Sequence, residues 1–109
     1  MIGYKNIEKE EIIELKKQVS YQQGQVVSKT LVQNNAVSIT LFAFEGQEEI
    51  STHASGGDAM VTVLEGKGKF TIDGTEYVLN TGESIIMPAG KPHAVFAVER
   101  FKMLLTVVF

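Results

Sequence analysis

The stretch from Gly82 to His93 constrains the fold of this chain more than any other. It contains both prolines and one of the two histidines of the 109-residue sequence. Pro88 and Gly90 form a Pro-x-Gly corner between short runs of β-type residues, and proline is tolerated in sheets only at strand ends, edges and bulges. The stretch therefore predicts a turn at Gly82, a short strand, a second turn at Pro88–Gly90, and a histidine at the start of the next strand.

The rest of the chain after about residue 24 also has the two-residue period of β-strands. Between residues 38 and 41, Ser and Thr alternate with Ile and Leu, the pattern of a strand covered mainly on one face. Asn34-Asn35 predicts a turn, and Asp73-Gly74 predicts a type I′ hairpin because both of its central positions need positive φ. Strands are predicted at 25–32, 36–44, 60–64, 69–72, 76–79, 84–87, 94–98 and 101–109. Short strands joined by turns, with no helix between them, indicate an antiparallel sandwich or barrel.

Residues 7–18 have a different pattern. Ile12, Ile13 and Leu15 lie among strong helix formers, with four glutamates early in the stretch and Lys16-Lys17 at its end. This charge order suits the helix macrodipole and predicts one short helix. We therefore expect a single domain over 1–109, made of an N-terminal helical segment at 1–23 and a β-barrel at 24–109.

Composition excludes several classes of function. The net charge is −3 and Lys and Arg do not cluster, which argues against a nucleic-acid partner. No apolar run is long enough to span a bilayer, and the N-terminus lacks the pattern of a secretory signal. We therefore expect a cytoplasmic protein with no membrane partner. Since the chain has no cysteine, any metal would need His, carboxylate or water ligands.

The spacing Gly82-x5-Pro88-x-Gly90-x2-His93 resembles the second conserved motif of the cupins, although Ala97 stands where that motif ends with asparagine. The run from Val63 to Gly74 is also cupin-like, and the resemblance covers roughly residues 36–108. It implies an all-β fold, the cupin-type double-stranded β-helix or jelly-roll barrel (RmlC-like), with six or more strands, which the short helix predicted at 7–18 precedes.

The first cupin motif is degraded in this chain. A cupin metal is usually held by two histidines and a glutamate of the first motif, plus the histidine of the second. By position, His53 and His93 take the first and last of these places, whereas Ser55 and Ala59 occupy the other two. A serine hydroxyl is a poor ligand for a divalent metal and an alanine methyl is none. The resemblance thus implies His53 and His93 as the metal-binding residues, with half of the ligand set missing.

A third ligand would have to come from a nearby carboxylate. Asp58 would reach the pair only if the strand bulged near Gly56-Gly57, because it alternates with Ala59. Glu48 and Glu49, in the segment before His53, are the other candidates, although spacing alone does not show that either reaches the pair. The metals considered are iron, manganese, zinc and nickel, of which nickel is readily acquired by imidazole pairs during purification.

Two classes of function remain open at this point. The first is a small-molecule-binding barrel without catalysis, in which an apolar or sugar-like ligand occupies the central cavity. The alternative is a metal-dependent enzyme of the dioxygenase or isomerase type, with its reduced ligand set completed by water and one carboxylate. A purely structural or partner-binding barrel is a third possibility. The predicted pocket residues are His53, Ser55, Ala59, His93, Phe96 and Met103.

No residue is assigned a catalytic role. A homodimer is expected, because the early strand Gln25–Val32 must be paired or covered to protect its edge.

Overall fold

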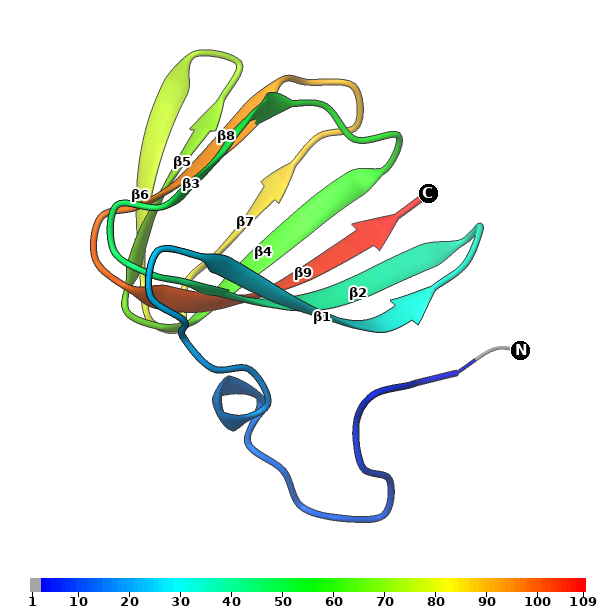
Figure 1. Ribbon diagram of the computed structural model, residues 1–109. Helices are drawn as coiled ribbons and strands as arrows, with labels where there is room; N and C mark the ends of the chain where they lie inside the picture. The colour runs from blue at the N-terminus through cyan, green and yellow to red at the C-terminus, as the bar shows by residue number, and fades with distance from the viewer. Residues whose placement is uncertain (1–2) are drawn as a thin grey trace.

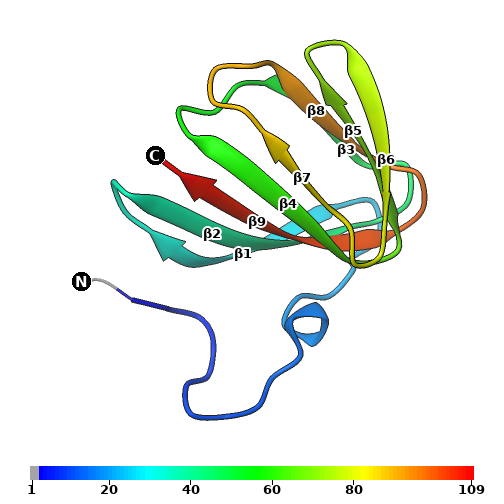
Figure 2. The same ribbon diagram turned by 180° about the vertical axis from the view of Figure 1, so that it is seen from behind.

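The computed structural model describes residues 3–109, which form two antiparallel sheets that face each other (Figure 1). The five-stranded sheet has the order β1-β2-β9-β4-β7 and the four-stranded sheet the order β3-β8-β5-β6. The strands are β1 (Val26–Gln33), β2 (Val37–Phe44), β3 (Glu49–His53), β4 (Asp58–Glu65), β5 (Lys67–Ile72), β6 (Thr75–Asn80), β7 (Ser84–Met87), β8 (His93–Ala97) and β9 (Phe101–Val108). Figure 2 shows the same two layers from behind. The predicted all-β jelly-roll class is confirmed.

The predicted turns lie where the local residues require them. Asp73 and Gly74 have φ values of 48° and 86°, so the β5–β6 hairpin has the positive φ at both positions that its sequence predicts. At the β1–β2 turn, the side-chain oxygen of Asn34 accepts hydrogen bonds from the backbone N–H groups of Ala36 and Val37, at 2.8 and 3.0 Å. These turns fix the two hairpins by local chemistry.

Strand β3 is not among the predicted strands. Its residues Glu49–His53 are mostly exposed, so they lack the apolar alternation that marks a half-buried strand. It pairs with β8 at the edge of the four-stranded sheet, with a register irregularity between Ile50 and His53. Backbone pairing with β8, rather than side-chain burial, holds this segment.

The N-terminal helix is much shorter than residues 7–18. Helical structure among the described residues is confined to a 3₁₀ turn at Leu15–Lys17. Glu10, within the predicted range, has a φ of 60°, which a continuous right-handed helix does not allow. Ile7 and Leu15 pack on the five-stranded sheet whereas Ile12 is exposed. Packing on the sheet therefore overrides helix propensity in this segment.

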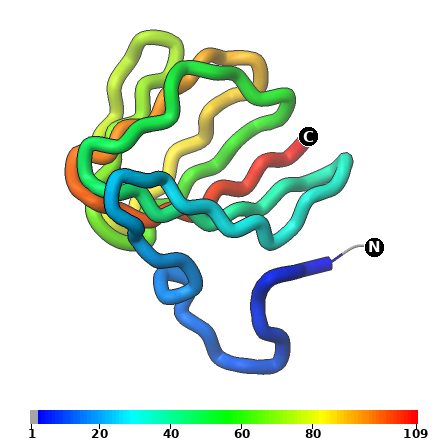
Figure 3. The backbone as a smooth tube through the Cα atoms, viewed as in Figure 1, coloured from blue at the N-terminus to red at the C-terminus, as the bar shows by residue number. Residues whose placement is uncertain are grey.

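The N-terminal segment runs along the outer face of the five-stranded sheet, on the side away from the four-stranded sheet (Figure 3). Lys5 N–H donates to the Leu31 carbonyl at 2.8 Å, and the Tyr21 hydroxyl donates to Glu65 at 2.6 Å. Burial, and next the neighbouring Glu65, raise the pKa of Tyr21, so its hydroxyl keeps the proton that it donates. No helix in residues 3–109 has the length and hydropathy needed to cross a membrane.

The space between the sheets is filled at one end and hollow at the other. Phe44 stacks on Phe101 with a centroid distance of 4.7 Å, and Phe70 meets Phe101 edge-on at 6.0 Å. Phe44 ends β2 and Phe101 begins β9, so this aromatic cluster closes the end of the barrel where those residues pair. The hollow end is the opposite one, where His53 ends β3 and His93 begins β8.

Candidate functional site

A cavity of about 220 Å³ opens between the sheets at this hollow end. Its walls come from both sheets and are mostly aliphatic, aromatic or thioether side chains. The residues that line it are Phe42, Ile50, His53, Ser55, Ala59, Met87, His93, Val95, Met103, Leu105 and Val107. The side-chain polar groups of this wall belong to His53, Ser55 and His93, so polar recognition in the cavity is concentrated in these three residues.

The two histidines are cross-strand neighbours. His53 of β3 is paired in register with His93 of β8, and such pairs place side chains in contact on one face of a sheet. Their Nε2 atoms are 3.1 Å apart, and the ring planes are inclined at 71°. His93 is buried at 3% exposure while His53 is exposed. The pair thus joins the cavity to solvent.

The Nδ1 atom of each imidazole also contacts a backbone carbonyl oxygen. His53 Nδ1 lies 2.9 Å from the carbonyl oxygen of Ser51, and His93 Nδ1 lies 3.1 Å from that of Lys91. With the Nδ1 side of each ring on a carbonyl, the Nε2 atoms of the two rings face each other. Burial, and next the neighbouring His53, lower the pKa of His93, which favours the neutral imidazole at neutral pH.

Two loops at the mouth of the cavity are joined by hydrogen bonds. Asp58 Oδ1 accepts from the backbone N–H of Ala89 at 2.8 Å. The Ser55 carbonyl accepts from Gly90 N–H at 2.9 Å. These contacts connect the loop before β4 to the Pro88–Gly90 turn. That turn leads directly into Lys91, whose carbonyl orients His93.

The structure brings five of the six predicted pocket residues to one cavity: His53, Ser55, Ala59, His93 and Met103. Phe96 does not line it. Because side chains alternate along β8, His93 and Val95 face the cavity while Phe96 lies on the opposite face, with Lys69 Nζ 5.3 Å from its ring centroid. The lining role assigned to Phe96 is thus corrected by strand alternation.

None of the three carboxylates considered as a third ligand joins the histidines. Asp58 is exposed and bonded to Ala89, Glu49 is exposed and alternates with the cavity-lining Ile50, and Glu48 does not line the cavity. Within residues 3–109, no group of three or more His, Cys, Asp or Glu side chains is placed to hold a metal ion.

Sequence reasoning missed most of the apolar wall: Phe42, Ile50, Met87, Val95, Leu105 and Val107. Alternation carries a usable signal for some of them. Val95 lies two positions from His93, and Leu105 and Val107 follow Met103 at steps of two, so they share its face. Ile50 had no such signal because β3 itself was not predicted.

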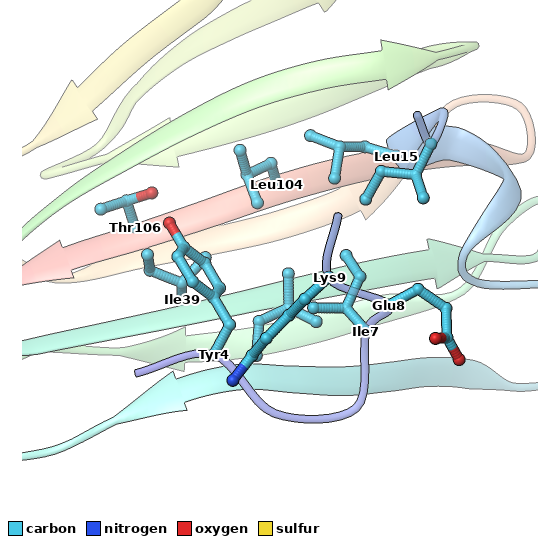
Figure 4. A pocket seen from close by; sticks show the side chains of 10 residues that line it. Tyr4, Ile7, Glu8, Lys9, Leu15, Ile39, Leu104 and Thr106 are labelled. Carbon is cyan, nitrogen blue, oxygen red and sulfur yellow. The ribbon is translucent and has the colours of Figure 1, made fainter. Parts of the chain in front are cut away.

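A larger groove, of about 400 Å³, lies outside the barrel between the N-terminal segment and the five-stranded sheet (Figure 4). Tyr4, Ile7 and Leu15 line it from the segment, and Ile39, Leu104 and Thr106 from the sheet. Among the described residues, its wall contains no histidine and none of the predicted pocket residues. The smaller cavity inside the barrel is therefore the better candidate site.

Whether a resident metal fits the cavity depends on how many ligand atoms its side chains offer. The two Nε2 atoms converge, and each Nδ1 lies on a carbonyl, as is usual for metal-binding histidines. Catalytic metal sites generally keep three protein ligands, and this cavity offers two imidazoles, with Ser55 and Ala59 in the other places. The residues present do not complete a resident metal site.

Comparisons with known proteins agree with this fold. The Cupin domain family matches residues 40–109. A conserved protein of unknown function from Streptococcus pyogenes is 46% identical, with a TM-score of 0.96, over 99% of this chain and 95% of that one. A cupin superfamily protein from Desulfitobacterium hafniense is 31% identical, with a TM-score of 0.93, over 97% of each chain. No curated protein matches.

The two facing antiparallel sheets with a site at one open end define a jelly-roll barrel of the cupin class. This chain belongs to the cupin family. Its members include small-molecule-binding proteins and metal-dependent enzymes.

Proposed function

We propose that this protein is a small-molecule-binding cupin without catalysis, and that its ligand occupies the central cavity against His53 and His93. The observation that carries the proposal is an apolar cavity of about 220 Å³ with two imidazoles at its mouth. At roughly 30 Å³ per water, this volume corresponds to about seven water molecules. It is below the range of roughly 300–1,000 Å³ typical of drug-sized ligands, so the ligand is compact.

The chemistry of the wall favours an apolar ligand over a sugar-like one. Most of the lining side chains, such as Val95, Met103 and Leu105, offer no hydrogen bond. Each sugar hydroxyl buried without a partner would cost about 1–3 kcal/mol. A ligand with an apolar body and one polar group matches the wall better.

The alternative is a metal-dependent enzyme of the dioxygenase or isomerase type. The observation in its favour is the convergence of the two Nε2 atoms at 3.1 Å. The incomplete ligand set weighs against it.

Filling the cavity tests the binding proposal. Ala59 lines the cavity and is buried at 1% exposure. We expect Ala59→Leu to weaken toluene binding at least about tenfold, because the added methyl groups take the space that the probe needs. Binding is followed by NMR shifts of the methyl groups of Val95, Met103 and Leu105.

The matched control is Ala36→Leu, at an exposed position in the β1–β2 turn, which should leave toluene binding unchanged. Thermal unfolding of both variants verifies that they are folded. Native protein whose cavity methyl groups do not respond to toluene at any concentration would contradict the proposal.

We also propose a homodimer formed through the outer face of the five-stranded sheet. Met60, Ile86 and Val108 are 43%, 57% and 58% exposed on or beside this face, which the N-terminal segment covers only in part. Strand β1 lies at the edge of the same sheet. An uncovered apolar face and a sheet edge both favour association with a second copy.

We also propose that the protein is cytoplasmic.

Light scattering tests the dimer. We expect the native protein to have twice the mass of the chain, and Met60→Glu with Ile86→Glu to reduce it to the monomer. Val78→Glu is the control, since Val78 is 52% exposed on the other sheet. A native mass equal to the monomer would exclude the dimer.

A further inference from the structure

The backbone fixes the proton positions on both imidazoles of the cavity. A carbonyl oxygen only accepts hydrogen bonds, so the Nδ1 atoms beside Ser51 O and Lys91 O must carry the hydrogens. This assignment follows from the hydrogen-bond network. In a neutral imidazole the other nitrogen then has a lone pair and no hydrogen. When both rings are neutral, both Nε2 atoms are therefore acceptors.

The two acceptors face each other without a donor between them. The two Nε2 atoms are 3.1 Å apart, which is a hydrogen-bond distance. If both rings are neutral and carry their hydrogen on Nδ1, however, each Nε2 has only a lone pair, so neither can donate to the other. Turning either ring to the Nε2–H tautomer would move the conflict to Ser51 O or Lys91 O. A group that brings its own hydrogen relieves this conflict with both backbone contacts kept.

The residues around the histidine pair determine which charge the donor group of the ligand can carry. The cavity wall contains no carboxylate, so a buried ammonium would lose its hydration without a counter-charge. A carboxylate only accepts hydrogen bonds, so it would face the lone pairs of the two Nε2 atoms without a donor. An uncharged hydroxyl has neither cost, because it supplies one hydrogen and remains neutral on burial.

We propose that the ligand of the central cavity is a compact apolar molecule with one neutral hydroxyl group, whose hydrogen is accepted by the Nε2 atoms of His53 and His93. This inference rests on the proposed binding function. It assigns to the histidine pair a ligand contact in place of the metal that the remaining residues do not complete.

The test compares four probes of similar size: p-cresol, 4-methylanisole, benzoate and benzylamine. They are titrated calorimetrically into the full chain at pH 8 after dialysis against a chelator, so that no metal occupies the histidine pair. We expect p-cresol to bind at least about tenfold more tightly than 4-methylanisole, which has the same apolar body but no donor. Benzoate and benzylamine should bind more weakly than p-cresol.

A variant links this preference to the pair. His53 is exposed, so His53→Leu should fold, and we expect it to reduce the preference for p-cresol several-fold while 4-methylanisole still binds. On the native protein, ¹⁵N NMR should show p-cresol changing the Nε2 shifts of both histidines. This second readout is independent of the variant.

The outcomes separate the two proposals. Equal affinity for p-cresol and 4-methylanisole overturns the hydroxyl inference and leaves the binding function standing. Tightest binding of benzoate or benzylamine also overturns the inference, because the pair would then recognise a charge. If no probe binds, the proposed function and this inference both fail.

Discussion

A chain that carries both Ser55→His and Ala59→Glu is expected to bind a divalent transition metal at least about 100-fold more tightly than the native chain. Both positions line the cavity beside His53 and His93. The two substitutions restore the side chains that the cupin pattern has at these places. The loss of an outer-shell partner alone typically costs 10–100-fold in metal affinity, and here two direct ligands are added.

The measurement is competition with a chromogenic chelator, together with elemental analysis of protein purified without a metal-affinity tag. We expect the native chain to contain metal well below one equivalent and the double variant to approach one. Ser55→His with Ala59→Gln is the matched control, because the amide has the size of the carboxylate but is a weaker ligand. It should bind less metal than the glutamate variant.

Two results would contradict this expectation. Stoichiometric iron, manganese or zinc in the native chain, lost in His53→Ala with His93→Ala, would favour the metal-dependent enzyme. A folded double variant with native metal affinity would show that positions 55 and 59 do not converge with the histidines. Circular dichroism distinguishes this second case from misfolding.

Gly66→Ala is expected to destabilise the fold by more than about 3 kcal/mol. Gly66 has a φ of 81°, where an L-residue costs roughly 1–2 kcal/mol. A Cβ there would also collide with the backbone carbonyl of Arg100 and lie 2.8 Å from Phe101 Cα. Backbone atoms yield little, so overpacking adds about 1–3 kcal/mol or more.

Gly74→Ala measures the cost of the positive φ without the steric overlap. Gly74 has a similar φ of 86°, but a Cβ there meets nothing within 4 Å. We expect this variant to lose only about 1–2 kcal/mol. Urea unfolding of the native chain and both variants gives the comparison. Equal losses at the two positions would mean that the contact with Arg100 and Phe101 contributes nothing.

Much of the barrel was predictable because its signals are local. The Gly82–His93 stretch predicted β7, the Pro88–Gly90 corner and the start of β8, since proline and glycine restrict φ wherever they stand. The Asp73-Gly74 hairpin was predictable for the same reason. Strand β3 was not, because an exposed edge strand has no apolar alternation and is held by its pairing with β8.

The N-terminal segment shows where local signals mislead. Its helix formers and charge order favour a helix, yet only Leu15–Lys17 forms a helical turn. Ile7 and Leu15 bury apolar surface against the sheet, and positive φ at Asn6 and Glu10 allows the chain to follow it. Propensities of a few tenths of a kcal/mol per residue are outweighed by such burial.

The sequence by itself determined the fold class and the positions of most strands and turns, and its resemblance to the cupin motifs puts Ser55 and Ala59 at two of the usual ligand places. These follow from residue identity, spacing and backbone restriction within short windows. Only the tertiary structure decided that His53 and His93 face each other at 3.1 Å with each Nδ1 on a carbonyl. It also decided that Asp58 joins the mouth loops rather than the pair. Such contacts depend on how β3 pairs with β8 and where separate loops meet, which no local pattern specifies.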